Sequence, residues 1–370
     1  MVAPSRPSVL VVAGGTGGHL FPAEALAVVL AKRGVAVHLA TDRRAAGYGG
    51  AFADDAVHVL ASATIRGRNP IALMRTGARL GLGLAQAWTL IGRLKPAAVV
   101  GFGGYPTVPP VLAAAWRGVP TLIHEANAVM GRANRLLAPR VTAIATTFPD
   151  LFRDAPKLAA KATLTGNPVR PAVVAAAATP YPAAADPLRI LTFGGSQGAR
   201  IMADVVPAAI GELEPALLKR LVVVQQAREE DLARVRSAYA KLAVAADIAS
   251  FFSDLPARMA ASHLIIARSG ASTVSELAAI GRPAILVPLP HALDQDQFAN
   301  AGVLQAAGGA IRLVQAEFTP RRLAEEITRL SAAPQRLSAM AAAARSLGRP
   351  DAAERLAGLV LRVTGLDSTK

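Results

Sequence analysis

The chain has 370 residues, of which 52% are hydrophobic and 18% charged, so it holds enough apolar material for two globular domains and is neither disordered nor collagen-like. It contains no cysteine, which excludes a disulfide framework, a thiolate zinc site and a cysteine nucleophile. The net charge is +15, but only 4% of the residues are aromatic, which leaves little material for base-stacking platforms, and we expect no nucleic-acid partner.

The first half of the chain predicts a doubly wound parallel sheet. Residues 9–13 form a short apolar run that is typical of a parallel strand buried on both faces. The loop GGTGGH (14–19), a helical pattern over 22–33 capped by Gly34, and a second apolar run over 35–40 complete a βαβ unit. Further strands are expected at 97–101, 121–124, 141–145 and near 163–165.

An uncharged segment over residues 96–116 is long enough to cross a bilayer. Its glycines and prolines, among them Gly103, Gly104, Pro109 and Pro110, would break the helix that lipid requires. We therefore predict a strand, a turn and a helix there. The N-terminal run ends in Gly-Gly and is similar to a first strand rather than to a signal peptide, so we expect the chain in the cytoplasm.

The pattern restarts after a proline- and alanine-rich stretch over 171–187, which predicts a linker. RILTFGGSQGAR (189–200) repeats the sequence of strand, glycine loop and helix, and strands are expected at 221–225, 248–252, 264–267 and 284–288. The sequence thus predicts an α/β protein with two Rossmann-like domains, residues 1–170 and 188–350, facing a cleft. Residues 351–370 form a C-terminal helix whose packing the sequence leaves open.

The positive charge is concentrated in the first domain. Residues 1–170 hold 19 Lys or Arg against 7 Asp or Glu, whereas residues 171–370 hold 21 against 18. No acidic residue lies between Ala56 and His124. Such a field favours an anionic surface, a lipid headgroup or a polyphosphate as partner, although a solvated basic face is the plain alternative.

The first glycine loop is not a standard nucleotide fingerprint. A G-x-G-x-x-G reading from Gly15 places Leu20 at the third glycine, and no Walker lysine is present. Asp42 follows the second strand, where a ribose-binding acid would lie, so a nicotinamide enzyme is a weak alternative. His19 suggests a proton acceptor or a substrate contact, and a helix-start histidine bonded to backbone is its structural alternative.

A second cluster of polar residues lies over 268–302. Ser269-Gly270 follows a strand, and Ser272 and Thr273 open a helix, an arrangement typical of an anion site at a helix N-terminus. Glu276 lies three residues after Thr273, so it fits a capping box as well as a ligand for ribose hydroxyls. Spacing alone leaves both interpretations of Glu276 open.

Seven motifs in order along the chain carry a resemblance. They are GGTGGH (14–19), GFGGYP (101–106), HEAN (124–127), TGNPVR (165–170), GGSQGAR (194–200), RSGASTVSE (268–276) and PLPHALDQDQFANA (288–301). Together they resemble the family of peptidoglycan enzymes that add N-acetylglucosamine to undecaprenyl-pyrophosphoryl-N-acetylmuramyl-pentapeptide. The resemblance covers nearly the whole chain, with Ala126 standing where the family's motif reads HEQN.

The resemblance implies an inverting glycosyltransferase of the GT-B fold, with an acceptor- and membrane-facing first domain and a second domain that binds the UDP-sugar. It implies no metal and no cofactor. His19 becomes a candidate base or acceptor ligand, with Glu125 as a competing base, and Glu276 becomes the ribose ligand. By motif position, the implied substrate contacts are Thr16, Gly17, Gly18, Asn127, Arg170, Ser196, Phe252, Ala271, Ser272, Thr273, Val274, Ser275, Glu276 and Gln297.

The implied partners are UDP-N-acetylglucosamine, the undecaprenyl-pyrophosphoryl-muramyl-pentapeptide and the anionic cytoplasmic face of the membrane, where the protein would be peripheral. Two other classes stay open: a UDP-sugar enzyme with the same fold, such as an epimerase or a glycosyltransferase on a soluble acceptor, and a noncatalytic basic membrane-binding protein.

Overall fold

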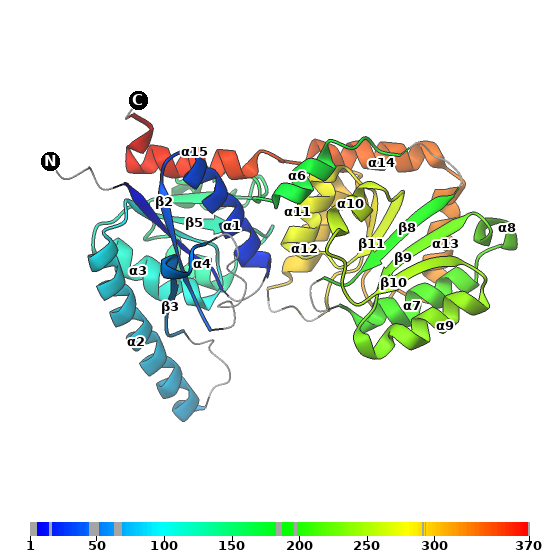
Figure 1. Cartoon of the computed structure of the whole chain (residues 1–370), viewed down its shortest axis with the longest axis horizontal. Helices are drawn as coiled ribbons and strands as arrows, with labels where there is room; N and C mark the ends of the chain where they lie inside the picture. Colours follow the sequence, from blue (N-terminus) through cyan, green and yellow to red (C-terminus); the bar gives the residue numbers. More distant parts are fainter. Residues whose placement is uncertain are drawn as a thin grey trace. The chain divides into compact units, whose positions relative to one another are not determined.

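The structure is a computed structural model, and it describes residues 6–14, 17–43, 52–62, 69–182, 187–195, 198–290, 292 and 294–368. The chain divides into two compact units (Figure 1). The first comprises Met1–Arg170 together with Asp351–Lys370, and the second comprises Pro171–Pro350. Among the described helices, none combines the length and the apolarity that a bilayer crossing requires.

The first unit is a parallel sheet with strands in the order β3-β2-β1-β4-β5-β6-β7. Its strands are β1 (Ser8–Val12), β2 (Ala36–Thr41), β3 (Val57–Val59), β4 (Ala98–Gly101), β5 (Thr121–Glu125), β6 (Ala143–Thr146) and β7 (Ala162–Leu164). Its helices are α1 (Gly17–Lys32), α2 (Pro70–Leu94), α3 (Val108–Trp116), α4 (Arg132–Leu137), α5 (Pro156–Ala159) and α15 (Ala352–Thr364), with the short 3-10 turns η1 (Asp54–Ala56), η2 (Tyr105–Thr107) and η4 (Leu366–Ser368).

The second unit repeats this design with the strand order β10-β9-β8-β11-β12-β13, again parallel throughout. Its strands are β8 (Leu188–Phe193), β9 (Leu221–Gln226), β10 (Ala245–Ala249), β11 (Leu264–Ala267), β12 (Ala284–Leu286) and β13 (Ala310–Arg312). Its helices are α6 (Pro171–Ala177), α7 (Arg200–Gly211), α8 (Pro215–Leu218), α9 (Leu232–Lys241), α10 (Leu255–Ala260), α11 (Ala271–Ile280), α12 (Asp296–Ala306), α13 (Pro320–Ser331) and α14 (Pro334–Ser346), with η3 (Glu229–Asp231) before α9.

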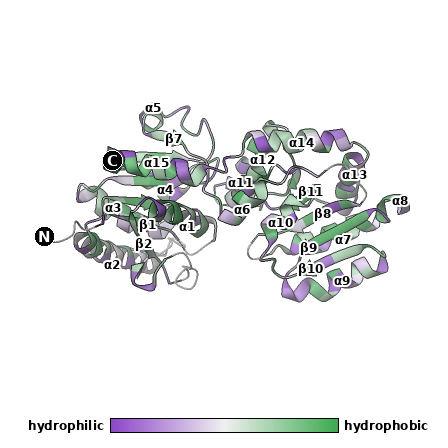
Figure 2. Cartoon of the chain, turned by 45° about the horizontal axis from the view of Figure 1, so that its top comes forward, coloured by the Kyte–Doolittle hydropathy of each residue, from purple (hydrophilic) through white to green (hydrophobic). Residues whose placement is uncertain are grey.

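Aliphatic side chains account for both cores. The central strands β1 and β11 are buried on both faces because helices cover each side of a parallel sheet. Figure 2 shows α1 hydrophobic along most of its length, and the side chains of Leu20, Leu26 and Leu30 on it are almost fully buried. The predicted α/β class with two Rossmann-like sheets is confirmed.

Several predicted elements need correction. Helix α1 begins at Gly17, not at Pro22, so His19 lies in its first turn and Pro22 lies inside the helix. Strand β10 spans Ala245–Ala249 because it pairs in register with β9, and Phe251 and Phe252 follow it. The edge strands β3 and β13 were not predicted, because His58 and Arg312 interrupt the apolar residues of these three-residue segments and leave no continuous apolar run.

The segment over 171–187, predicted to be a linker, begins with a helix instead. Pro171 starts α6, and α6 packs against α10 and α11 of the second unit. Arg282 donates hydrogen bonds to the carbonyl oxygens of Thr179 and Pro180 at 3.3 and 3.0 Å, which fixes the chain after α6. These contacts are long-range, so composition alone could not predict them.

The C-terminal helix belongs to the first unit. Helix α15 lies beside α1, more than 300 residues away in the sequence (Figure 1). Leu356, Ala357 and Val360 on α15 are fully buried in the same core as α1 and the strands of the first sheet. The end of the chain therefore completes the core of the first unit.

Candidate functional site

Most of the motif residues gather at the carboxyl edges of the two sheets. In an open parallel α/β sheet this edge is where ligands bind, because loops and helix N-termini meet there. In the first unit the loops after β1, β4, β5 and β7 carry the motifs, and in the second unit the loops after β8 and β11 and the segment after β12 do so. Thr16 and Ser196 lie outside the described residues.

His19 lies against the glycine loop that follows β4. A Cβ atom on Gly103 would lie 3.2 Å from His19 Cε1, and one on Gly104 would lie 3.5 Å from His19 Cδ2. Both glycines have positive φ, +90° and +78°, which L side chains rarely adopt. Thr107 Oγ1 holds this loop by donating to the Gly103 carbonyl oxygen at 2.6 Å. Gly103 and Gly104 of the motif GFGGYP therefore pack against the histidine ring with backbone atoms alone, and we call these two residues the glycine floor.

Glu125 organises the loop that follows β5. Its Oε1 accepts hydrogen bonds from the backbone N–H and the side-chain amide of Asn127, at 3.0 and 3.3 Å. Its Oε2 accepts from the backbone N–H of Gly131 at 3.0 Å and from Asn134 Nδ2 at 2.8 Å. Burial raises the pKa of Glu125, although these donors oppose the shift. The buried Glu125 carboxylate thus joins Asn127 and Gly131 of the loop to Asn134 of α4 through four hydrogen bonds.

His124, near the end of β5, is hydrogen-bonded to the loop after β7. Its Nε2–H donates to the Gly166 carbonyl oxygen at 3.0 Å, and its ring lies 5.5 Å from that of Phe102 between centroids. Burial lowers the pKa of His124 to about 4. The ring is therefore neutral at pH 7, with the proton on Nε2.

Arg170 ends the TGNPVR motif beside the first turns of α1. Its guanidinium lies over the Phe21 ring, with 4.8 Å between Cζ and the ring centroid. Glu24, on the same helix, has its pKa raised by burial and lowered by the charge of Arg170. Phe21 and Glu24 therefore hold the arginine at the start of α1, where Gly17 and Gly18 open the helix.

The glycine loop after β8 is shaped for close backbone approach. A Cβ atom on Gly194 would lie 2.2 Å from the Ala199 backbone nitrogen, and Gly195 and Gly198 have φ of +88° and +66°. The Gly194 N–H donates to Gln226 Oε1 at 3.1 Å, which ties this loop to the end of β9. The loop leads directly into the N-terminus of α7, where partial positive charge favours phosphate.

Helix α11 begins with Gly270 as its N-cap, and no side chain caps it. The capping-box interpretation of Thr273 and Glu276 is therefore wrong, because Glu276 lies in the second turn, and its side chain is buried. The hydroxyl oxygens of Ser272 and Ser275 are buried with no hydrogen-bond partner within the described part of the chain. This helix start presents free backbone donors and two hydroxyl groups to a ligand.

Gln297 is anchored at the start of α12. Its Oε1 accepts from the Leu289 N–H at 3.0 Å, and its backbone carbonyl oxygen accepts from Ser269 Oγ at 2.8 Å. Asn300 Nδ2 donates to the Ser269 carbonyl oxygen at 3.2 Å. The segment after β12 is thereby joined to the loop after β11, as the resemblance requires if both contact one nucleotide.

Phe252 is buried, and the guanidinium of Arg258 covers its ring at 4.2 Å from the centroid. Its side chain therefore belongs to the fold, and only its backbone is suited to a ligand contact. Within the described residues, no group of three or more His, Asp or Glu could hold a metal ion.

Comparison with known proteins identifies the family. Residues 9–146 match the model of the glycosyltransferase family 28 N-terminal domain, and residues 189–356 match that of its C-terminal domain. The chain belongs to glycosyltransferase family 28. This membership replaces the nicotinamide-enzyme alternative, for which Asp42 was the signal.

Relatives of this family 28 chain match over nearly its whole length. Proteins of Rhodopseudomonas palustris (strain BisB18) and Nitrobacter winogradskyi are 64% and 62% identical over 98% and 97% of this chain, covering 97% and 98% of theirs. Both are named UDP-N-acetylglucosamine--N-acetylmuramyl-(pentapeptide) pyrophosphoryl-undecaprenol N-acetylglucosamine transferase. The crystal structure of MurG from Acinetobacter baumannii matches with a TM-score of 0.79 at 30% identity, covering 96% of this chain and 99% of that one.

The predicted GT-B architecture agrees with these family 28 matches. A putative UDP-N-acetylglucosamine 2-epimerase of Listeria monocytogenes shares the fold at a TM-score of 0.67 and 15% identity, covering 99% of this chain and 98% of its own. Sequence reasoning did not single out Arg268, Gln226 and Asn134, whose side chains donate to or accept from the motif segments at Pro288, Gly194 and Glu125. For Arg268 a signal existed, since a charged residue directly after a buried strand lies at the functional edge of the sheet.

Proposed function

We propose that this family 28 enzyme transfers N-acetylglucosamine from UDP-N-acetylglucosamine to the 4-hydroxyl of the muramyl sugar of undecaprenyl-pyrophosphoryl-N-acetylmuramyl-pentapeptide, with inversion. The observation that carries the proposal is 64% identity over 98% of the chain to a relative named for this transfer. The test is transfer of radiolabel from the nucleotide sugar to the muramyl lipid. Turnover of the nucleotide sugar without any lipid acceptor would instead indicate the epimerase-like or soluble-acceptor alternative.

In the proposed mechanism, the muramyl 4-hydroxyl displaces UDP at the anomeric carbon in one step. The leaving diphosphate gains negative charge, which backbone N–H groups at helix N-termini and a guanidinium can stabilise without a metal. The free helix start at α11, the glycine loop before α7 and Arg170 provide such groups. The proposed contacts are Thr16, Gly17, Gly18, Asn127, Arg170, Ser196, the Phe252 backbone, Ala271, Ser272, Thr273, Val274, Ser275, Glu276 and Gln297.

Glu276 is the proposed ligand of the ribose hydroxyls. Loss of a charge-assisted hydrogen bond costs about 1.5–3 kcal/mol, so Glu276→Ala should raise the donor KM by about 10- to 150-fold. The exposed Glu317 in the same unit gives the control variant Glu317→Ala. A lower melting temperature with unchanged donor KM would contradict the ribose role.

His19 is the proposed base or acceptor ligand, placed on the glycine floor described above. The attacking hydroxyl loses a proton, and a positioned general base contributes about 10²–10⁴-fold. If His19 is the base, His19→Ala should lower kcat, leave the donor KM unchanged and remove the acid limb of the pH profile of kcat. A rise in acceptor KM with that limb retained would make His19 a diphosphate ligand instead.

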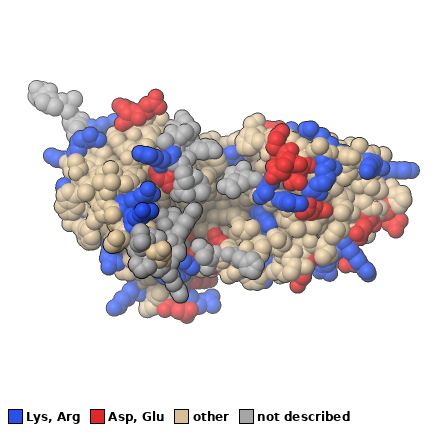
Figure 3. Space-filling model, turned by 90° about the horizontal axis from the view of Figure 1, so that it is seen from below, with Lys and Arg blue, Asp and Glu red and all other residues tan. Residues whose placement is uncertain are grey.

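The first unit is proposed to dock peripherally on the anionic cytoplasmic face of the membrane. We define its docking face by two groups of residues. The apolar group consists of the exposed side chains of Met74, Leu82, Trp88 and Trp116, and the cationic group consists of Arg75, Arg79 and Arg117. Arg75 and Arg79 are exposed on α2, and the Arg117 guanidinium lies 4.3 Å from the Trp88 ring centroid. Figure 3 views the molecule from the side toward which the start of α2 points, and Lys and Arg atoms gather on the first unit there.

Apolar and cationic groups on one face are the two signals that peripheral binding needs. The acid-free stretch also offers Ile65, Arg66, Arg68, Ile71, Leu73, Leu80 and Leu84 to a docking face. Residues 65, 66 and 68 and the side chains of Ile71 and Leu73 lie outside the described part of the chain, and Leu80 and Leu84 are half-buried. Sedimentation with anionic and neutral vesicles at two salt concentrations tests the proposal. Trp116→Ser and Arg79→Gln should weaken binding and Arg153→Gln should not, while equal binding to neutral vesicles would refute the electrostatic part.

A further inference from the structure

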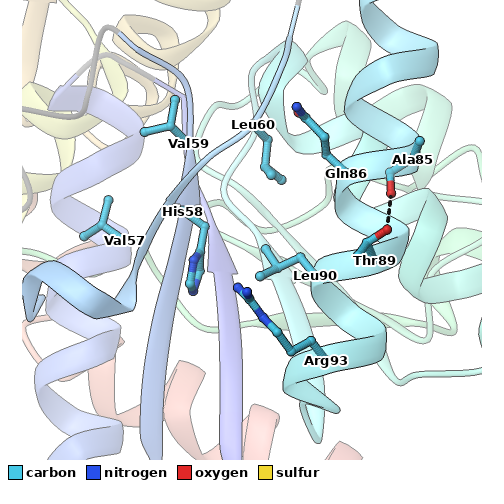
Figure 4. Close-up of a pocket in the computed structure, with 9 residues that line it drawn as sticks. All are labelled: Val57, His58, Val59, Leu60, Ala85, Gln86, Thr89, Leu90 and Arg93. Carbon is cyan, nitrogen blue, oxygen red and sulfur yellow. Dashed lines mark hydrogen bonds between the residues drawn. The ribbon is translucent and has the colours of Figure 1, made fainter.

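A hollow of about 620 Å³ lies between the edge strand β3 and helix α2, and it contains none of the motif residues used above (Figure 4). The hollow is open to solvent, and Gln86, Thr89 and Arg93 in its lining are exposed. Val57, His58, Val59 and Leu60 line it from β3 and the residue after it, and Ala85, Gln86, Thr89, Leu90 and Arg93 line it from α2.

One end of the hollow is built by close contact between helix and chain. A Cβ atom on Gly83 would lie 2.1 Å from the Ala61 carbonyl oxygen, so only a glycine at position 83 lets α2 come this close to residue 61. The Ala61 N–H donates to Gln86 Oε1 at 2.8 Å. With the strand and the helix joined there, His58 and Arg93 reach toward one another across the hollow (Figure 4).

The residues that line the hollow include a cation and no carboxylate, and Asp55 precedes β3 in the sequence. Within the described part of the chain, Arg93 makes no hydrogen bond or ion pair, and neither β3 nor α2 contains an acidic residue. His58 Nε2 lies 3.3 Å from His38 Nδ1, with the two rings stacked at 5.4 Å. Burial, His38 and Arg93 lower the pKa of His58, and Asp55 opposes them. A guanidinium and an imidazole that face each other without a carboxylate disfavour a cation and favour an anion.

We propose that this hollow binds a phosphate-bearing ligand, with the phosphate between Arg93 and His58 and an apolar portion against Leu60 and Leu90. The planar guanidinium matches two phosphate oxygens. Gln86 uses its carbonyl oxygen for Ala61, so its amide nitrogen is left to donate. The phosphate could belong to a soluble metabolite or to a lipid headgroup, and the chemistry of recognition is the same.

The test is calorimetric titration of the full-length protein with inorganic phosphate, sn-glycerol 3-phosphate and monomeric dihexanoyl phosphatidic acid. UDP is kept saturating so that the proposed donor site is occupied. Arg93→Gln should weaken phosphate binding by at least about tenfold, the loss expected for one charge-assisted contact. Arg153→Gln removes the same charge from an exposed position of the same unit, outside both the hollow and the docking face, and should change phosphate binding by less than about threefold.

The pH dependence provides a second readout. A bound phosphate stabilises the charged imidazole, against the opposing charges of Arg93 and His38. The phosphate probes themselves take up a proton at a pH of about 6, which weakens binding in every variant as the pH falls, so the readout is the ratio of wild-type to variant affinity at each pH. His58→Gln keeps a donor but cannot titrate, so the advantage of the wild type over His58→Gln should grow as the pH falls from 8 to 6, whereas the ratio of wild-type to Arg153→Gln affinity should stay constant. Equal affinity for the three probes would indicate a soluble phosphate, and clear preference for phosphatidic acid a lipid headgroup.

Absence of saturable binding by every probe would overturn the proposal, as would equal weakening by Arg93→Gln and Arg153→Gln. Both variants lie at exposed positions, so a folding defect is not expected to obscure the result. Circular dichroism of each variant verifies this point. Transfer activity with a detergent-solubilised acceptor should be unchanged in Arg93→Gln, which separates this site from the proposed enzymatic function.

Discussion

The variant Glu125→Gln distinguishes between two roles of Glu125, positioning of Asn127 and proton abstraction as the general base. The carboxylate accepts two hydrogen bonds on each oxygen, from Asn127 on one side and from Gly131 and Asn134 on the other. A glutamine side chain has nearly the same shape but only one acceptor atom. Whichever way the amide is turned, its NH₂ group faces two N–H donors.

The expected loss follows from this count. Two charge-assisted hydrogen bonds at about 1.5–3 kcal/mol each give a gross loss of about 3–6 kcal/mol. The neutral amide needs no desolvation of a charge, and burial already disfavours the ionised carboxylate, as the raised pKa indicates. We therefore expect Glu125→Gln to lower the free energy of unfolding of the first unit by about 2–4 kcal/mol, or its melting temperature by about 4–16 °C.

Scanning calorimetry measures the stability, and the transfer assay below the melting temperature measures kcat and donor KM. Asn127 loses its anchor, so donor KM should rise while the pH profile of kcat keeps its shape. Glu214→Gln, an exposed glutamate of the second unit, controls for the change of charge. Unchanged melting with loss of kcat and of one limb of the pH profile would refute the positioning role and make Glu125 the base.

Three further predictions concern the first unit. Gly103→Ala should cost about 1–3 kcal/mol of stability in backbone strain, and it should also lower kcat because the new Cβ atom would displace His19. Gly118→Ala, at φ +71° with open space around it, should lower stability alone. Equal kcat in the two variants would argue against the glycine floor. Because the pKa of His124 is lowered to about 4 in the folded state, the unfolded chain binds more protons below about pH 6.5, and the first unit should lose up to about 3 kcal/mol of stability as the pH falls from 6.5 to 4. His124→Gln, which can still donate to Gly166, should remove this slope in urea titrations at several pH values, and an unchanged slope would assign it to other groups. Leu356→Ala in α15 should cost about 2–5 kcal/mol in urea unfolding, because this side chain is fully buried, whereas Val174→Ala at an exposed position should cost little.

The sequence by itself determined the fold class and the places where chemistry is concentrated. Continuous apolar runs such as that of β1 and β11 are specific for buried parallel strands, and a glycine loop after such a strand marks the carboxyl edge. Local spacing is sufficient for these conclusions because strand, turn and helix N-terminus are neighbours in the chain.

Only the tertiary structure decided how these residues are used. Glu276 and Glu125 each had two interpretations in the sequence. The structure excludes the capping box for Glu276, because α11 has Gly270 as its N-cap, and it places four hydrogen-bond donors around the Glu125 carboxylate. The placement of α15 on α1, the short edge strands and the α2–β3 hollow also depend on contacts between distant segments. Such contacts leave no local periodicity, because their free energy comes from packing between residues that the sequence separates by tens to hundreds of positions.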